Sequence, residues 1–219
     1  PEDVARRLHR PRADRERMRE HRVDLGLRAD IVRRHKLENI APTENDTLFR
    51  KKLVHGWVHD PTAAMLGGVS GHAGLFGTAN DVTVIMQMLL QGGDYGATHF
   101  LSESVIRQFT SAQFPEHGNR RGLTFDRPTE KPVKDGPVCE SASQQSFGHS
   151  GFTGTYTWAD PANGLVYVFL SNRVNPNASN NQLAKSNLRT RIHQKAYEIL
   201  LKAKHIGLTP EKRENPLSL

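Results

Sequence analysis

The segment Phe147-Gly148-His149-Ser150-Gly151-Phe152-Thr153-Gly154-Thr155-Tyr156-Thr157-Trp158 decides the fold of this chain. It opens with small residues and then alternates Thr, Tyr and Trp, a pattern typical of a strand whose two faces differ. A cluster of turn formers follows at 160–164, and residues 165–170 (LVYVFL) are a nearly continuous apolar run. We therefore predict a β-hairpin with strands at 147–158 and 165–170, joined by the turn at 160–164.

Three glycines give the first strand a second property. Gly148, Gly151 and Gly154 lack a Cβ atom, so the backbone there is open to a ligand or to another chain segment. A strand that begins with Gly-His-Ser-Gly presents a titratable ring, a hydroxyl group and bare amides along one edge. We expect a functional site at this edge.

A glycine-rich loop precedes the first predicted helix. Residues 67–77 contain five glycines but not the lysine of a phosphate-binding P-loop, so a phosphate site is not favoured. We expect a close-packed loop that borders a pocket. The helix after it is capped by Asn80 or Asp81, and Gly92-Gly93 ends it.

Two more helices are predicted. The first begins at Ser102 and runs to Phe109, and the second is a long amphipathic helix at 181–203. The apolar positions of the second helix are Leu183, Leu188, Ile192, Ala196, Ile199 and Leu200. This face must lie on the sheet, which makes the fold α/β of the α+β type, with an antiparallel sheet flanked by helices.

Residues 38–60 are rich in turn formers, and we expect an ordered loop there. His55 and His59 are spaced i, i+4, which would suit metal ligands on a helix. Gly56 and Pro61 argue against a helix, so hydrogen bonding or packing is favoured for these histidines. No metal site and no cofactor are expected.

The composition fits one sizeable core. Of the 219 residues, 36% are hydrophobic, and the single cysteine, Cys139, excludes an intrachain disulfide. No apolar run approaches the roughly 18 residues of a membrane span, and the N-terminus lacks the apolar region of a signal peptide. Because the chain starts with Pro, we expect it to be part of something longer.

The net charge of +7 is concentrated at the N-terminus. Residues 1–34 hold eleven Arg against seven Asp and Glu, or +4. Such a segment could be a basic arm that binds nucleic acid, but a solvated or misread leader is favoured, so no nucleic-acid partner is expected. We divide the chain into the leader 1–37, a domain at 38–203 and a polar tail at 204–219.

A serine hydrolase of the elbow type is excluded, because Gly148-His149-Ser150-Gly151 lacks the Gly-x-Ser-x-Gly spacing and leads into a strand.

Two longer stretches resemble the serine β-lactamase-like family, which includes penicillin-binding proteins, class C β-lactamases and esterases. They are HGWVHDPTAAMLGGVSGHAGLFGTANDV at 55–82 and FGHSGFTGTYTWADP at 147–161, followed by LVYVFLSNRV at 165–174. The family's third motif, Lys-Thr-Gly or His-x-Gly, would be His149-Ser150-Gly151 here.

The resemblance covers roughly residues 38–203 and implies a partial β-lactamase/transpeptidase-like fold. It is similar to a branch of bacterial envelope proteins that is sometimes fused behind a family 3 β-N-acetylglucosaminidase. This implies a periplasmic or cell-envelope location and a glycosidase domain ahead of this chain in its parent. It also implies a small-molecule or peptide acyl substrate.

By position, the resemblance implies that His149 and Ser150 line the pocket and hydrogen-bond the substrate. The amide of Phe152, just after Gly151, would be one of two donors to the developing oxyanion. The implied catalytic residues are His149, Ser150, Gly151 and Phe152, and the implied substrate contacts are Gly71, His72 and Thr153.

The sequence departs from the family in one decisive respect. The nucleophile of the family lies in Ser-x-x-Lys, and no such motif occurs in these 219 residues; nor does Tyr-x-Asn or Tyr-Ser-Asp. We therefore expect the C-terminal part of a serine hydrolase that works through an acyl-enzyme and is inactive alone. The alternative is a non-catalytic module that binds cell-wall peptides.

Overall fold

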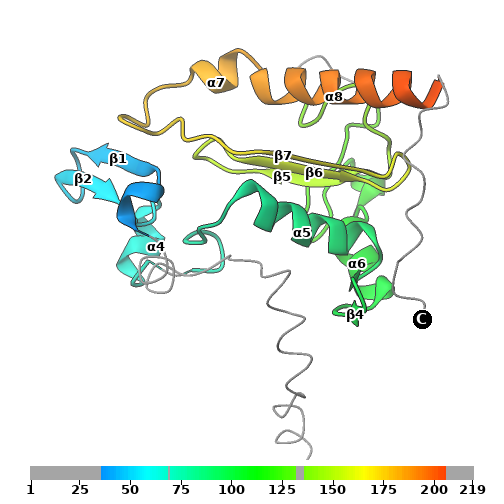
Figure 1. The fold of residues 1–219 in the computed structure, drawn as a ribbon, viewed down its shortest axis with the longest axis horizontal. Helices are drawn as coiled ribbons and strands as arrows, with labels where there is room; N and C mark the ends of the chain where they lie inside the picture. Colours follow the sequence, from blue (N-terminus) through cyan, green and yellow to red (C-terminus); the bar gives the residue numbers. More distant parts are fainter. Residues whose placement is uncertain (1–35, 69, 132–135, 206–219) are drawn as a thin grey trace, which may run out of the picture. The chain divides into compact units, whose positions relative to one another are not determined.

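The structure is a computed structural model that describes residues 36–68, 70–131 and 136–205. Nearly all of the predicted leader 1–37 and most of the tail 204–219 lie outside these residues, so the domain boundaries at 38 and 203 stay predictions. The chain divides into two compact units, Pro1–Ile85 and Met86–Leu219. Each unit is described by itself below, with the elements labelled as in Figure 1.

The first unit contains a β-hairpin where we predicted a loop. After the short 3-10 helix η1 (Leu37–Asn39), strand β1 (Pro42–Asp46) pairs antiparallel with β2 (Lys52–His55). The loop prediction is wrong because turn formers between two strands can be the turn of a hairpin. The Asp46 carboxylate closes that turn by accepting from the amides at 48, 49 and 50, at 3.0, 2.9 and 2.9 Å.

Two helices follow the hairpin. The short helix α4 (Pro61–Met65) is capped by Asp60, and α5 (Ala79–Leu90) begins after the glycine-rich loop. The predicted cap of α5 is corrected to Thr78, whose hydroxyl accepts from the Asp81 amide at 3.3 Å. The Asp81 carboxylate in turn accepts from the amide and hydroxyl of Thr78, both at 2.7 Å, as in a capping box. The predicted end of the helix is confirmed by a 2.9 Å bond from the Gly93 amide to the Met88 carbonyl.

The division between the units falls within α5, and after this helix the second unit continues with small elements. Strands β3 (Asp94–Tyr95) and β4 (Thr98–His99) form a minimal hairpin, and helix α6 (Glu103–Thr110) and 3-10 helix η2 (Pro115–His117) follow. The predicted start of α6 is confirmed, because the Ser102 hydroxyl accepts from the Val105 amide at 3.4 Å.

The main sheet has the order β5-β6-β7, from β5 (Phe147–Ser150), β6 (Tyr156–Asp160) and β7 (Leu165–Phe169). The predicted β6–β7 hairpin and its turn are confirmed. The prediction that 147–158 is one strand is wrong, because the chain reverses at its glycines. The Gly151 amide bonds the Thr155 carbonyl at 2.8 Å, and Gly154 has a φ of 110°, which only glycine adopts easily.

The predicted terminal helix is present but interrupted. Helix α7 (Gln182–Lys185) and helix α8 (Leu188–His205) are separated at Asn187, which has a φ of 51°. Asparagine tolerates this left-handed conformation better than most residues. As predicted, α8 lies along one face of the sheet, and α6 lies on the other side in Figure 1.

The face of α8 that meets the sheet is not the one we predicted. Leu188, Ile192 and Ile199 are 39%, 40% and 70% exposed, whereas His193 and Tyr197 are buried. Both buried rings find polar partners inside the unit: the Tyr197 hydroxyl donates to Asp160 at 2.6 Å, and the Tyr156 hydroxyl lies 3.2 Å from His193 Nδ1. These partners come from the sheet, so helical spacing alone could not identify this face.

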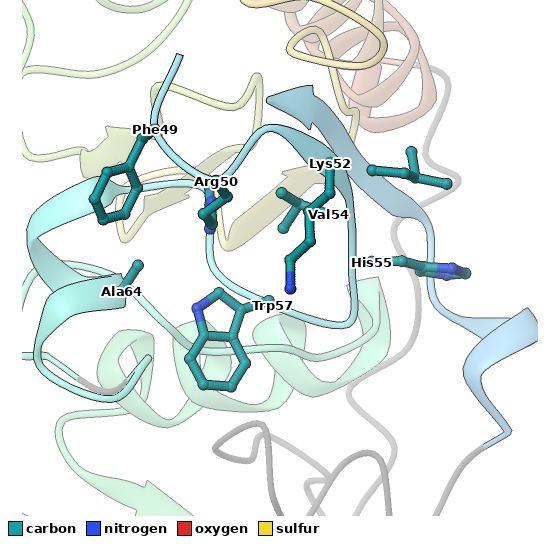
Figure 2. Close-up of a pocket in the computed structure, with 8 residues that line it drawn as sticks. Phe49, Arg50, Lys52, Val54, His55, Trp57 and Ala64 are labelled. Atoms are coloured by element: carbon teal, nitrogen blue, oxygen red, sulfur yellow. The ribbon is translucent and has the colours of Figure 1, made fainter. Parts of the chain in front are cut away.

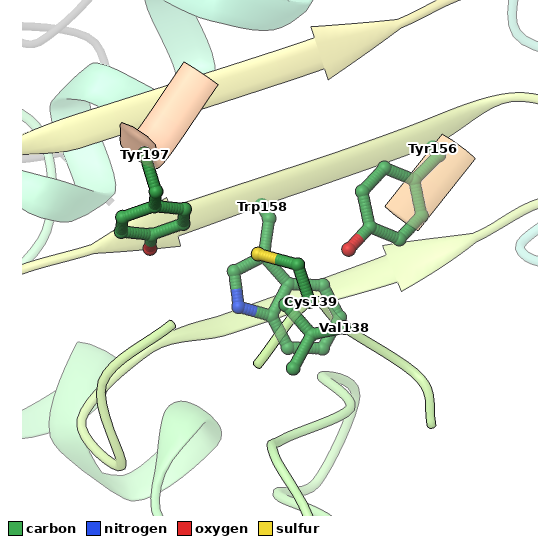
Figure 3. Packing of buried hydrophobic residues seen from close by; sticks show 5 residues of the cluster. All are labelled: Val138, Cys139, Tyr156, Trp158 and Tyr197. Carbon is green, nitrogen blue, oxygen red and sulfur yellow. The ribbon is translucent and has the colours of Figure 1, made fainter. Parts of the chain in front are cut away.

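The core beneath α8 is largely aromatic. Figure 3 shows its five buried members, which are Val138, Cys139, Tyr156, Trp158 and Tyr197. Tyr156 and Trp158 stack at 5.7 Å, and the His193 ring stacks on Tyr167 at 4.2 Å. In the described part of the chain, no helix has the length and apolar character to cross a membrane.

Burial of His193 predicts that stability depends on pH. Burial lowers the pKa of this ring from 6.5 to about 4, an effect that nearby Asp160 partly offsets. Below about pH 6.5 the unfolded chain therefore takes up a proton that the folded chain does not. We expect the free energy of unfolding to fall by about 3 kcal/mol as the pH decreases through this window.

Urea unfolding at pH 7, 5.5 and 4 measures this dependence. In His193→Phe, which keeps an aromatic ring beside Tyr167 but cannot titrate, most of the slope between pH 6.5 and 4 should disappear. The carboxyl groups of Asp46, Asp60 and Asp160 have lowered pKa values and lose their charge below this window. An unchanged slope in the variant would show that His193 is not responsible.

Candidate functional site

His149 and Ser150 lie at the end of β5, where the strand emerges from the core. Phe147 and Gly148 are buried, whereas His149 and Ser150 are exposed. His149 pairs with Thr157 on β6, and the neighbouring pair is Gly148 with Trp158. Because paired residues share a face and successive residues alternate, His149 lies on the face opposite Trp158 and helix α8.

The imidazole of His149 is held by an arginine that the sequence analysis missed. The guanidinium of Arg121 lies 2.9 Å from His149 Nε2, and His149 Nδ1 lies 2.9 Å from the Ser150 carbonyl oxygen. Arginine can only donate, so Nε2 must accept. Nδ1 then carries the proton and donates it to the carbonyl, which fixes the tautomer and the orientation of the ring.

The loop that carries Arg121 is attached to the strand itself. Asp126 and Gly148 exchange two backbone hydrogen bonds, at 2.7 and 3.0 Å, and the Arg121 amide donates to Asn119 Oδ1 at 3.0 Å. These bonds correct the prediction of bare amides along the edge, because the Gly148 amide is already used.

The turn after Ser150 is braced by a second arginine. The Arg173 amide donates to the Thr153 carbonyl at 2.8 Å, and its Nε donates to the Phe152 carbonyl at 2.7 Å. The guanidinium also lies 4.2 Å above the Phe152 ring. Arg173 therefore fixes the turn between β5 and β6, and with it Gly151, Phe152 and Thr153. That the Phe152 amide binds an oxyanion, and that Thr153 contacts substrate, stay predictions.

Gly71 and His72 belong to the first unit. There, His72 Nε2 lies 2.9 Å from Asp60 Oδ1, and His72 Nδ1 lies 2.8 Å from the Ser70 hydroxyl. Gly71 is exposed, and a Cβ atom built on it would meet nothing within 4 Å. The role of these two residues in binding the same substrate as His149 stays a prediction.

The first unit also holds a cavity of about 410 Å³ beside the β1–β2 hairpin, lined by residues that include Phe49, Arg50, Lys52 and Trp57 (Figure 2). None of the predicted site residues lines it. The Arg50 guanidinium is occupied by Asp46 at 2.8 Å, Glu44 at 2.7 Å and two backbone carbonyls. This cation stabilises the hairpin and is not presented to a ligand.

His55 and His59 each lie against a polar group of the first unit, in line with the predicted role in packing or hydrogen bonding. His55 Nε2 lies 2.5 Å from the Ile40 carbonyl oxygen, and His59 Nδ1 lies 2.9 Å from Glu44 Oε1. Among residues 36–68, 70–131 and 136–205, no group of three or more His, Cys, Asp or Glu side chains is arranged to hold a metal ion.

Comparison with known families adds a decisive observation to this geometry. The family model described as Beta-lactamase matches residues 6–191 of the chain. The chain belongs to the Beta-lactamase family. This confirms the resemblance drawn from the two sequence stretches, and it places His149-Ser150-Gly151 in a serine β-lactamase and penicillin-binding-protein type of domain.

Relatives of this Beta-lactamase family chain carry a more specific name. A protein of Escherichia coli (strain K12) named "Putative D-alanyl-D-alanine carboxypeptidase" is 34% identical over 154 residues, which cover 65% of this chain and 35% of that protein. A protein of the same name from Salmonella agona is 37% identical over 139 residues, covering 59% and 32%. The chain thus spans about a third of the length of these curated relatives.

Among solved structures, a β-lactamase from Mycobacterium bovis matches with a TM-score of 0.44 and 22% identity. The match covers 58% of this chain and 46% of that one.

The sequence pointed to His149 and Phe152 but gave no indication of the two arginines that contact them, Arg121 and Arg173. Arg121 lies 28 residues before His149, and Arg173 lies 21 residues after Phe152. Neither belongs to a motif, and both lie in polar segments that contain other arginines or asparagines. The sequence could at most suggest that some cationic residue lies near a strand with a His-x-Gly motif. It could not indicate which arginine that is.

Proposed function

We propose that this chain is the C-terminal part of a serine hydrolase that acts on acyl substrates through an acyl-enzyme. The serine and lysine of Ser-x-x-Lys, and the tyrosine of the second motif, would come from upstream sequence of a longer parent. Two observations support this: the chain spans about a third of its curated relatives, and these motifs are absent from its 219 residues. A glycosidase domain further upstream belongs to the same proposal.

The substrate class we propose is a peptide with a free carboxylate at the cleaved end, as in D-alanyl-D-alanine stems. The contact between Arg121 and His149 carries this proposal. A guanidinium has five N–H donors, and one of them bonds His149 Nε2 in an exposed position on the strand edge. The others suit a carboxylate, which arginine binds with two parallel hydrogen bonds. Ser150, next along the strand, would bond the peptide near the bond that is cut.

The test begins with the gene. Reading upstream of the codon for Pro1 in all three frames should reveal Ser-x-x-Lys followed by Tyr-x-Asn or Tyr-Ser-Asp. The longer product should release D-alanine from a tripeptide ending in D-Ala-D-Ala, and the 219-residue chain should release none. A start codon with neither motif ahead of this chain would refute the hydrolase and favour the non-catalytic module for cell-wall peptides.

Arg121 gives a prediction within the longer product. We expect Arg121→Ala to lower kcat/KM for the tripeptide at least about tenfold, because a hydrogen bond to a charged group is worth roughly 1.5–3 kcal/mol. The effect should lie mainly in KM, since the carboxylate is bound before and during the reaction. Arg107→Ala is the charge-matched control, because Arg107 is exposed on α6 and pairs only locally with Glu103, at 2.9 Å. Equal kinetics for both variants would remove Arg121 from substrate binding.

A further inference from the structure

Three polar side chains of the first unit form a continuous hydrogen-bonded chain. Ser70 Oγ lies 2.8 Å from His72 Nδ1, and His72 Nε2 lies 2.9 Å from Asp60 Oδ1. Asp60 is the N-cap of α4, whereas Ser70 and His72 lie in the glycine-rich loop, so the link between Asp60 and His72 joins residues twelve apart. The three residue types, in this order, are those of a nucleophile, a base and an orienting acid.

The direction of these hydrogen bonds follows from Asp60. The Ala63 amide, which bonds Asp60 at 2.8 Å, and the His72 ring lower the pKa of this carboxyl group. The ionised carboxylate only accepts, so Nε2 of His72 carries the proton that is donated to it. In the neutral ring, Nδ1 then has a lone pair directed at Ser70, and it accepts the hydroxyl proton. Compared with the usual triad, the two ring nitrogens have exchanged roles.

The surroundings of Ser70 leave room for a substrate. The His72 side chain is 53% exposed, and Ser70 itself is half-buried. Gly71 follows the serine, and a Cβ atom on it would meet nothing within 4 Å. The loop is held by a hydrogen bond from the Ser70 amide to the Ala73 carbonyl at 3.1 Å. A small acyl group can therefore approach the hydroxyl oxygen without displacing a side chain at position 71.

We propose that Ser70, His72 and Asp60 form a second nucleophilic site, in which Ser70 accepts acyl groups from carboxylic esters. The Ser70 oxygen forms a bond to the acyl carbon while its proton passes to Nδ1 of His72. The ester C–O bond breaks, and the leaving alcohol takes that proton. Water then attacks the acyl carbon and gives a proton to Nδ1 of His72. The bond between that carbon and the Ser70 oxygen breaks, the carboxylic acid leaves, and His72 returns the proton to the Ser70 oxygen. Besides the ester, the only reactant that this sequence of steps consumes is water.

The experiment uses the 219-residue chain and an alkyl fluorophosphonate. This probe transfers its phosphorus to an activated serine oxygen and releases fluoride. Mass spectrometry of the digested protein should show one adduct per chain, at Ser70, and none in Ser70→Ala. His72→Ala should slow the labelling at least about 100-fold, the lower range for a general base. Adducts at Ser150 or Ser104 that form as fast as the one at Ser70, or equal rates with and without His72, would overturn the proposal.

Asp60→Asn separates the proposed positioning role of Asp60 from its structural role. Asparagine caps a helix as well as aspartate, so α4 keeps its cap, but the neutral amide no longer fixes the tautomer of His72. We expect labelling to slow about tenfold or more, with an unchanged melting temperature. Labelling at the rate of the unsubstituted chain would remove Asp60 from the site. A lowered melting temperature, with a labelling rate that falls only in proportion to the folded fraction, would assign Asp60 a structural role only. Since this chain lacks Ser-x-x-Lys, labelling of Ser70 is independent of the hydrolase proposed above.

Discussion

Asp160→Ala is expected to lower the free energy of unfolding by about 4 kcal/mol, because it removes a buried charge that several buried donors need. The side chain is fully buried at the end of β6. Its carboxylate accepts from the Ser143 amide and hydroxyl at 3.0 and 2.6 Å, and from the Tyr197 hydroxyl at 2.6 Å. It also accepts from the amides of Ala162 and Asn163 and from the Asn163 side chain, at 3.0, 3.3 and 2.9 Å.

This one carboxylate joins three parts of the second unit. It closes the β6–β7 turn, fixes the loop at Ser143 and attaches α8 through Tyr197. Burial opposes the charge of Asp160, but these hydrogen bonds outweigh it and lower the pKa of the carboxyl group. In the alanine variant the donors remain buried without an acceptor. Their lost hydration is then uncompensated, and this lowers the free energy of unfolding.

Urea unfolding followed by tryptophan fluorescence measures the loss. Asp94→Ala is the matched control, because the Asp94 side chain is 58% exposed and pairs with His99 at the surface, so its removal should change stability by less than about 0.5 kcal/mol. Ser143→Ala removes one of the donors, and its loss of unfolding free energy should lie between the losses for Asp160→Ala and Asp94→Ala. A loss for Asp160→Ala no larger than that for Asp94→Ala would contradict the role of Asp160 as the centre of this network.

Gly148→Ala should destabilise the second unit by about 3 kcal/mol and displace His149 from Arg121. A Cβ atom at this position would lie 2.2 Å from the Thr157 carbonyl oxygen and 2.3 Å from Trp158 Cε3. Neither can retreat, because the carbonyl belongs to the neighbouring strand and the Trp158 side chain is 1% exposed. Strand β5 must therefore move away from β6, and His149 is the next residue along it.

The displacement is measured through the His149 ring. Arg121 donates to Nε2, so the nitrogen NMR shifts of the ring report whether this bond is intact. Both the ring shifts and the unfolding midpoint should change in Gly148→Ala. Gly71→Ala is the stability control, because a Cβ atom there meets nothing within 4 Å. If the Gly148→Ala variant is destabilised but the ring nitrogen shifts of His149 are unchanged, the substitution does not displace His149 from Arg121.

The sequence predicted the elements whose determinants are local. The β6–β7 hairpin follows from a turn cluster between two β-type runs, the start of α6 from Ser102, and the end of α5 from Gly92-Gly93. The family was predicted from two stretches at 55–82 and 147–174, and it was confirmed by the match over residues 6–191. In each of these cases the information lies within a few residues of the feature, or in its order along the chain.

The sequence misled where one pattern fits two structures. A glycine-rich segment at 151–154 is compatible with an open strand edge and with a reversal, and only the bond from Gly151 to Thr155 selects the reversal. The turn formers at 38–60 fit a loop and a hairpin equally. The hydrogen bonds from the amides at 48–50 to the Asp46 carboxylate select the hairpin. Likewise, Ile192 and Ile199 follow helical spacing, but His193 and Tyr197 are the residues whose polar atoms find partners on the sheet.

By itself, then, the sequence determined the class of fold, the family, the position of His149-Ser150-Gly151 and the absence of Ser-x-x-Lys from this chain. The tertiary structure alone decided which side chains meet: Arg121 with His149 at 2.9 Å, Arg173 with the turn at Phe152, and Asp60 with His72. The reason is physical. Helix caps, turns and strand patterns are set by neighbours in the chain, whereas a hydrogen bond between distant side chains exists only once the backbone has brought them together.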